Sequence, residues 1–283
     1  MPLVNMTEML RAATKQRYAV GSFNTFNVEM TKGVVDAATK LRAPVILAYG
    51  EVFGRLFPME QYAAYIRRVA DDANVPVALL LDHASRLDSV MRALDCGFTS
   101  IMVDVSDKPL QENIAVTLKA KKLCEGYGAS LESEIGHVPG LEADYDSSLQ
   151  DDFSAHTDAE EARLFISETC VDALAISIGT AHGFYHGEPS LDFGRLHELR
   201  EALDVPLVVH GASGLGHDDY YRCVEGGISK FNIHTDLTQA ALDFVNKDGQ
   251  DEKNYMEKCL GTAGAVEALA ANLIHVFGSA GKA

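Results

Sequence analysis

Short apolar segments alternate with amphipathic segments along most of the chain. Eight of the apolar segments are rich in Val, Ile, Leu or Ala and are short enough to be strands that are buried on both faces. These predicted strands cover residues 18–24, 44–50, 75–83, 99–105, 129–136, 173–179, 206–211 and 228–235. Segments with helical periodicity lie between them, at residues 29–41, 59–73, 87–96, 109–125, 158–169, 192–203, 218–225 and 237–245.

Eight strand–helix units predict an α/β structure with a parallel sheet, a (β/α)8 TIM barrel. The length of 283 residues suits one such domain, and no linker divides it. We therefore expect a single barrel domain over residues 1–283, with a helical extension at its C-terminus. The main interruption is a long segment at about residues 136–157, which we expect to be a mobile loop that covers the site.

Three histidines occur where predicted strands end. His83 follows Asp82 at the end of the third strand, His182 follows the sixth, and His210 closes the seventh. In a barrel of this kind the C-terminal ends of all strands meet at one rim, where active sites are formed. Three imidazoles that converge there and leave a fourth position open are typical of a catalytic zinc site. The sequence thus predicts metal-assisted chemistry.

The charge and composition exclude several classes of protein. Acidic residues outnumber lysine and arginine by 41 to 24, and this negative charge disfavours nucleic acid and anionic membranes as partners. No apolar run approaches the roughly 18 residues of a membrane span, and residues 1–6 do not resemble a signal peptide. The five cysteines form no C-x-x-C pair, which argues against disulfides and a thiolate zinc site. We expect a cytoplasmic protein.

A second candidate site lies where the seventh and eighth strands end. Gly211-Ala212-Ser213-Gly214 follows the seventh strand, and Asn232-Ile233-His234-Thr235-Asp236 ends the eighth. Barrels hold phosphate at this place through backbone N–H groups and the N-terminus of a helix. Such a site would supply a local positive field in an acidic protein. A plain tight turn is the alternative interpretation of the Gly-Ala-Ser-Gly segment.

Several short motifs, taken together, resemble one known family. They are Asp82-His83-Ala84, Ser133-Glu134-Ile135-Gly136, Ile178-Gly179-Thr180-Ala181-His182-Gly183, Val208-Val209-His210-Gly211-Ala212-Ser213-Gly214 and Lys230-Phe231-Asn232-Ile233. With them the chain resembles the class II, zinc-dependent ketose-bisphosphate aldolases, which include fructose- and tagatose-bisphosphate aldolases. The resemblance extends from residues 19–24 to residues 277–283. It implies a lyase that cleaves a phosphorylated ketose to dihydroxyacetone phosphate and an aldehyde. Such a reaction belongs to carbohydrate metabolism, for example to glycolysis.

The resemblance also implies a metal-binding set. His83, His182 and His210 match the ligands of the catalytic zinc, and Asp104 and Glu134 match the carboxylates of an alternative metal position. Zinc bound to the ketose oxygens would act as a Lewis acid that spreads the charge left by carbon–carbon cleavage. A monovalent cation, Na+ or K+, often assists near the glycines that hold the substrate.

Further residues match the acid/base and substrate-binding positions of the family. Asp82 matches the group that exchanges a proton with the hydroxyl or aldehyde oxygen, and Glu142, on the predicted loop, matches the acid/base that serves the carbon. The positions that hold the dihydroxyacetone phosphate half are matched by Gly183, Gly211, Ser213, Asn232 and Thr235. To this predicted substrate-binding set we add the neighbouring Asn24, Ala212 and His234.

The chain departs from the family where the far end of the substrate would bind. Family members that act on bisphosphates commonly carry an arginine near the C-terminus, whereas residues 253–258 here contain none. Arg55 or Lys258 could bind an anionic far end, or either could be an ordinary surface charge. Three further departures from the common pattern are His234, His186 and Pro139. Fructose and tagatose 1,6-bisphosphate, other ketose 1-phosphates and deoxy-keto-sugar-acid phosphates all stay open as substrates.

Three alternatives remain open. Lys230 alternates with Asn232 on the eighth predicted strand and so points into the barrel, where a lysine can form a Schiff base as in metal-independent aldolases. A zinc hydrolase on the same fold is the second alternative, and a non-catalytic aldolase-like subunit is the third.

The resemblance favours a homodimer or a homotetramer.

Overall fold

The computed structural model describes residues 3–140, 156–185, 187, 189–247 and 253–283. Its centre is a closed barrel of eight parallel strands in sequence order, in which β8 pairs with β1. The strands are β1 (Val20–Asn24), β2 (Val45–Gly50), β3 (Val77–Ala84), β4 (Ser100–Val103), β5 (Ser130–Ile135), β6 (Ala173–Ile176), β7 (Leu207–Val209) and β8 (Ile228–Ile233). The predicted (β/α)8 barrel is confirmed.

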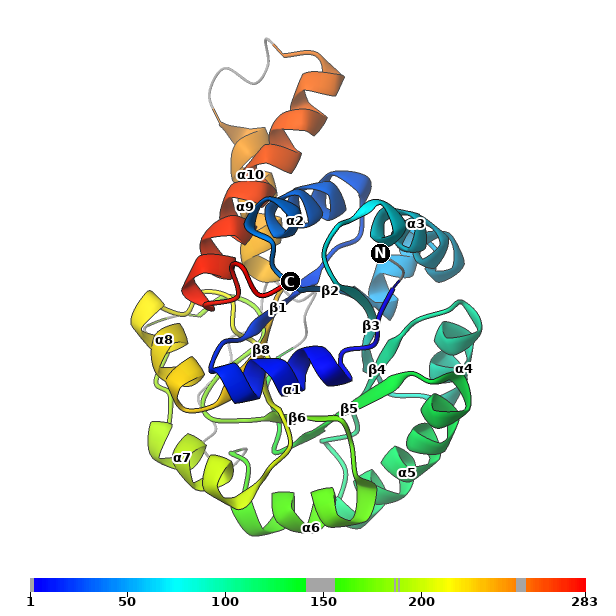
Figure 1. Cartoon of the computed structure of the whole chain (residues 1–283), viewed down its shortest axis with the longest axis vertical. Helices are drawn as coiled ribbons and strands as arrows, with labels where there is room; N and C mark the ends of the chain where they lie inside the picture. The colour runs from blue at the N-terminus through cyan, green and yellow to red at the C-terminus, as the bar shows by residue number, and fades with distance from the viewer. Residues whose placement is uncertain (1–2, 141–155, 186, 188, 248–252) are drawn as a thin grey trace.

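Helices surround the barrel as a ring (Figure 1). Those that follow the strands are α2 (Val28–Leu41), α3 (Met59–Asp72), α4 (Leu87–Asp95), α5 (Leu110–Tyr127), α6 (Ala159–Thr169), α7 (Phe193–Ala202), α8 (His217–Glu225) and α9 (Thr235–Asn246). Three elements lie outside this alternation: α1 (Thr7–Gln16), the 3-10 helix η1 (Glu51–Arg55) and α10 (Tyr255–Val276). Of these, α1 and η1 were not among the predicted elements, and α10 lies in the C-terminal region where we expected a helical extension.

The strands are apolar on both faces because each face is covered. On β2, Val45, Leu47 and Tyr49 belong to the core between the sheet and the helices, whereas Ile46 and Ala48 belong to a second core inside the barrel. Successive residues of a strand point to opposite faces, so both sets must be apolar. This double burial explains why the strands appear in the sequence as nearly continuous apolar runs.

Helix α1 closes the N-terminal end of the barrel. It lies across the strands in Figure 1, and its buried Leu10 and Ala13 share the interior core with Leu80 and Val208. The backbone N–H of Met6, just before the helix, donates to Ser100 Oγ at 3.2 Å, at the first residue of β4. The C-terminal ends of the strands are therefore left as the accessible end of the barrel.

Helix α10 packs against α2 and α9, and the last two helices extend beyond the ring in Figure 1. Gly33 of α2 allows the close approach, because a Cβ there would come within 2.9 Å of Val266 Cβ. Within the described part of the chain, α10 alone is long and apolar enough to cross a membrane. A single helix of this kind is weak evidence for a membrane span, and Val266, Ala270 and Ile274 of α10 are buried against the rest of the protein.

Candidate metal and active site

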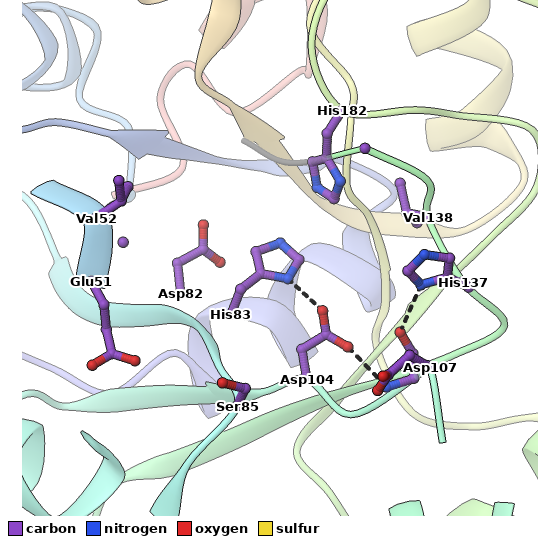
Figure 2. Close-up of a pocket in the computed structure, with 13 residues that line it drawn as sticks. Glu51, Val52, Asp82, His83, Ser85, Asp104, Asp107, His137, Val138 and His182 are labelled. Atoms are coloured by element: carbon purple, nitrogen blue, oxygen red, sulfur yellow. Dashed lines mark hydrogen bonds and ion pairs between the residues drawn. The ribbon is translucent and has the colours of Figure 1, made fainter. Parts of the chain in front are cut away.

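His83, His182 and His210 come together at the C-terminal end of the barrel. His83 is the penultimate residue of β3, His210 follows β7 directly, and His182 lies between β6 and α7. One ring nitrogen of each histidine lies within 4.8 Å of those of the other two. Figure 2 shows the rings of His83 and His182 pointing toward the same space. The structure thus brings together the three side chains that the sequence predicts to share an ion.

A local irregularity in β3 lets Asp82 and His83 face the site together. Neighbouring residues of a regular strand point to opposite faces, yet both of these line the same cavity. Against β4, the pairs on either side are Leu81 with Ile101 and Ala84 with Val103, so β3 holds one extra residue between them. Such a bulge redirects side chains. His83 has a φ of 49°, which is uncommon for a residue other than glycine.

The three imidazoles fit a divalent metal ion. His83 Nε2 lies 2.9 Å from His210 Nδ1. His182 is buried, and neither of its ring nitrogens has a hydrogen-bond partner among the described residues. Burial lowers the pKa of His182 and of His210 well below the usual range, and the charge of His83 lowers both further. Both rings are therefore neutral at pH 7, the form in which imidazole binds metal ions.

Asp104 and Glu134 form a second group around His83. Asp104 Oδ2 lies 2.8 Å from His83 Nδ1, and the possible ligand atoms of all three residues lie within 4.8 Å of one another. Burial acts to raise the pKa of Asp104, but the hydrogen bond to His83, the charge of His83 and the hydrogen bonds from Ser106 together lower it. Burial and the charge of Asp104 raise the pKa of Glu134 to about 8. The group could hold an ion once Glu134 loses its proton.

Asp82 is a buried carboxylate held by two amides. Its Oδ2 accepts a hydrogen bond from Asn24 Nδ2 at 2.8 Å, and Asn232 Nδ2 lies 3.1 Å from both of its oxygens. Burial acts to raise the pKa of Asp82, but the charges that His83 and His210 carry when protonated, with smaller contributions from Lys230 and Asn24, lower it overall. A positioned, ionised carboxylate beside a cavity is suited to accept a proton.

Glu132 is a site residue whose role the sequence analysis missed. Its Oε1 lies 2.8 Å from His210 Nε2 and 2.8 Å from Lys230 Nζ, and all three side chains are fully buried. A carboxylate in this position fixes the tautomer, so that His210 Nε2–H donates to Glu132 and Nδ1 is left for the site. The sequence did hold one indication of this role. Glu132 and Glu134 are two residues apart on β5, so both side chains point to the same, inward face of the strand.

The contact with Glu132 also bears on the Schiff-base alternative. Lys230 points into the barrel as its strand register predicts, but its Nζ is held by a buried carboxylate. A lysine that acts as a nucleophile needs a free amine. The ion pair therefore disfavours covalent catalysis by Lys230.

The predicted phosphate site is a narrow hollow at the N-terminus of α9. Gly183, Gly211, Ser213, Asn232, His234 and Thr235 line it together with His182. Ser213 Oγ accepts hydrogen bonds from the backbone N–H groups of His234 and Asp236, at 3.2 and 3.3 Å. A Cβ at Gly211 would collide with the backbone of Ala181, so only glycine allows these two segments to meet here. Helix N-termini of this kind bind anions.

Two details of this hollow differ from the sequence interpretation. The strand was predicted to continue through Thr235, but β8 ends at Ile233 and Thr235 is the first residue of α9. His234 is then the residue before the helix rather than part of a strand. Ala212 is fully buried, and its carbonyl oxygen accepts a hydrogen bond from the Tyr220 hydroxyl at 2.5 Å. Its side chain contributes to packing beneath the hollow.

A cavity of about 550 Å3 opens beside the histidines (Figure 2). Asp82, His83, Asp104 and His182 line it, as do His137, Val138 and Gly140 from the segment after β5. The predicted acid/base Glu142 lies outside the described residues, as do His186 and most of the predicted loop. The role of Glu142 stays a prediction.

The chain matches one protein family over nearly its full length. The sequence model of the family described as "Fructose-bisphosphate aldolase class-II" matches residues 4–282. The chain belongs to this family. The resemblance seen in the motifs is thereby confirmed, and a lyase that acts as an aldolase is supported at the level of the family.

Individual members of the aldolase family are similar over nine tenths of the chain or more. The 6-phospho-5-dehydro-2-deoxy-D-gluconate aldolase of Bacillus subtilis strain 168 is 35% identical, with 100% of this chain and 98% of the relative covered. A probable fructose-bisphosphate aldolase of the same organism is also 35% identical, over 90% and 92%. The crystal structure of the YdjI aldolase from Escherichia coli K12 has a TM-score of 0.89 at 33% identity and 99% coverage of both chains. The names of the two Bacillus subtilis relatives give different substrates.

Proposed function

We propose that the protein catalyses reversible, zinc-dependent aldol cleavage of a phosphorylated ketose to dihydroxyacetone phosphate and an aldehyde. The observation that carries this proposal is the cluster of His83, His182 and His210, with ring nitrogens within 4.8 Å of one another, in a chain of the aldolase family. Three neutral imidazoles are a ligand set of catalytic zinc sites. Asp104 and Glu134 are proposed as an alternative metal position.

The unpartnered nitrogens of His182 support a bound metal ion. Buried polar atoms in proteins nearly always have a partner, and within the described residues neither ring nitrogen of His182 has one. A zinc ion held by the three histidines would supply a Lewis acid that stabilises negative charge on the ketose oxygens. Glu132 and Lys230 would hold His210 in the orientation that this requires.

Asp82 is proposed to move the proton of the bond-breaking step. It accepts the proton of the C4 hydroxyl, the C3–C4 bond breaks, its electron pair stays with the three-carbon half, and C4 becomes the carbonyl carbon of the aldehyde. The amides of Asn24 and Asn232 keep the carboxylate in place. Glu142 remains our candidate for the group that gives a proton to C3, so that the three-carbon half leaves as dihydroxyacetone phosphate, neutral at that carbon.

The hollow at the N-terminus of α9 is proposed to hold the phosphate of the three-carbon half. Ser213 and the backbone at Gly183, Gly211 and Thr235 surround it, and the helix N-terminus favours a negative charge. Asn232, His234, Asn24 and Ala212 complete the proposed substrate site and its support. A monovalent cation, Na+ or K+, near the two glycines is part of this proposal.

We also propose that the protein works as a homodimer or homotetramer in the cytoplasm. Helices α9 and α10 extend past the barrel (Figure 1) and carry exposed apolar side chains. These are Leu242, Val245, Tyr255, Met256 and Leu260. Apolar surface of this kind often marks a contact between protein chains. Analytical ultracentrifugation of the purified protein would show a sedimenting species of two or four chains.

Metal analysis combined with an aldol assay tests the proposed function. We expect about one zinc ion per chain, loss of ketose cleavage after exhaustive chelation, and recovery when zinc is added back. Activity that survives zinc removal and is abolished by borohydride in the presence of substrate would instead assign the reaction to Lys230. Absence of both zinc and aldol cleavage, in protein whose fold is intact, would favour a non-catalytic subunit.

A further inference from the structure

Two exposed acidic residues line the cavity beside the histidines. Glu51, from η1, lies next to Val52, and Asp107, from the segment after β4, lies on the other side of the cavity with Ser85 between the two acids (Figure 2). We call these four residues the acidic wall. No lysine or arginine among the described residues lines this cavity. His182, which lines it as well, is only 7% exposed and has two ring nitrogens without a hydrogen-bond partner in the described structure. The acidic wall is therefore part of the chamber into which the candidate ligands point.

We propose that the aldehyde half of the substrate ends in uncharged, hydroxylated carbons, and that Glu51 and Asp107 select against a second phosphate or a carboxylate. This inference rests on the proposed aldol function. The phosphate of the three-carbon half has its own hollow at α9, so the rest of the ketose must extend through the cavity that the two acids line.

Electrostatics oppose an anion at this wall. A phosphate or carboxylate in the cavity would approach Glu51 and Asp107 without a lining arginine or lysine to neutralise it, and like charges in contact strongly disfavour a ligand. His137 also lines the cavity, but its Nδ1 lies 3.2 Å from Ser106 Oγ and is engaged there. Sugar hydroxyls, in contrast, are donors, and carboxylates are the strongest acceptors for them.

Two cations that are close in sequence to the acidic wall, Arg55 and Lys108, do not line the cavity. Lys108 forms an exposed ion pair with Asp107, at 2.9 Å, and lines a different hollow. Arg55 lines a hollow on the other side of Glu51. Glu51 is itself oriented by a hydrogen bond from Ser89 Oγ at 2.6 Å. An anionic group in the cavity would therefore meet the carboxylate of Glu51 before it met Arg55.

Condensation of dihydroxyacetone phosphate with two matched aldehydes tests the proposal on the metal-loaded protein. We expect kcat/KM for D-glyceraldehyde to exceed that for D-glyceraldehyde 3-phosphate by about tenfold or more. The same or a higher kcat/KM for the phosphorylated aldehyde would overturn the proposal. Because both values come from one preparation, their ratio does not depend on the fraction of protein that is folded.

Neutralising the two acids identifies the cause of the selectivity. Glu51→Gln combined with Asp107→Asn should raise the relative kcat/KM for the phosphorylated aldehyde by about threefold to tenfold. Glu8→Gln combined with Asp72→Asn, which removes two exposed charges on α1 and α3, should leave the ratio unchanged. A ratio that responds equally to both pairs, or a specific loss of the phosphorylated substrate in Arg55→Ala or Lys108→Ala, would refute the assignment.

A third measurement separates this proposal from the proposed function. Solvent deuterium should exchange into C3 of dihydroxyacetone phosphate when no aldehyde is present, because that step uses only the three-carbon half. Exchange together with preferential use of the neutral aldehyde supports both proposals. Exchange with preference for the phosphorylated aldehyde, or with no aldehyde accepted, overturns only the inference about the far end. Absence of exchange and of condensation rejects the aldol function and the inference with it.

Discussion

The two ends of the barrel interior are built from the same strands and have opposite chemistry. At the end covered by α1, the inward side chains are mostly apolar, for example Leu80 and Val208, and the polar ones there include the hydroxyls of Ser100 and Ser130. Two residues beyond Leu80 and Val208 on the same strands, the inward side chains are Asp82 and His210. Because every second residue of a strand faces inward, one strand can stabilise the fold at one end and carry the site at the other.

A charged layer separates these two ends. Lys230 and Glu132 form a fully buried ion pair, and His210 joins it through Glu132. A buried ion pair is weak support for stability by itself, because removing charges from water offsets much of their attraction. Its position between an apolar core and three histidines indicates that it orients the site. The comparison predicts that changes at the two ends should affect different properties.

Replacing a ligand at the open end should have the largest effect. We expect His210→Ala to lose bound metal and to lose aldol cleavage below detection, because the change removes one of three neutral donors. Metal content measured by mass spectrometry and turnover measured by a coupled assay would check this. His197→Ala, at an exposed residue of α7, is the control and should keep both. Full zinc occupancy in His210→Ala would show that the site is misplaced.

At the end of the barrel that α1 covers, we expect a substitution to lower the stability of the fold and to leave the catalytic rate unchanged. Leu10→Ala should lower the free energy of unfolding by about 2–5 kcal/mol, since it leaves a cavity under the barrel, while kcat per folded molecule stays unchanged. Urea denaturation gives the first value and steady-state kinetics the second. Leu118→Ala, at a side chain that is 43% exposed, should cost clearly less. A lowered kcat in folded Leu10→Ala would break the division between the two ends.

Removing the proposed proton acceptor should lower the catalytic rate without affecting metal binding. Asp82→Ala should reduce kcat by about a hundredfold or more while zinc remains bound. Because Asn24 and Asn232 lose their shared acceptor, we also expect a loss of about 1–3 kcal/mol in the free energy of unfolding. Asp72→Ala, at an exposed site, serves as the comparison. An unimpaired kcat in Asp82→Ala would exclude this residue as the base.

The charged layer should show a smaller effect, on metal affinity. Glu132→Gln should weaken zinc binding by about tenfold to a hundredfold, because the amide no longer holds His210 as a carboxylate does. Competition with a chromophoric chelator measures this affinity, and Glu168→Gln on the exposed side of α6 is the matched control. An unchanged zinc affinity would mean that Glu132 serves only to neutralise Lys230.

Strand ends were predictable from the sequence to a useful degree, and helix α1 was not. The alternation of apolar and amphipathic segments follows from burial of both faces of a parallel sheet, so all eight strands could be found. Helix α1 packs only part of its surface, through residues such as Met9 and Leu10, and lies before the first strand. Nothing local in that segment shows that it covers the end of a barrel.

The partners of the site residues were less predictable than the residues themselves. His83 and His210 could be singled out because they stand at strand ends. That Glu132 would meet His210, 78 positions away, depends on the closure of the barrel. The end of β8 at Ile233, rather than at Thr235, depends on where α9 begins to pack. Such boundaries are set by contacts between elements, which override local preference.

The sequence by itself determined the eightfold alternation, the family and the set of candidate ligands, because periodicity and short motifs are local properties of the chain. Only the tertiary structure decided how Asp82 and His83, adjacent in one strand, both reach the site. A regular strand would have separated them, and the extra residue in β3 with a left-handed backbone at His83 brings them to one side. The physical reason is that a bulge arises from pairing with a neighbouring strand, and one strand's sequence does not specify that register.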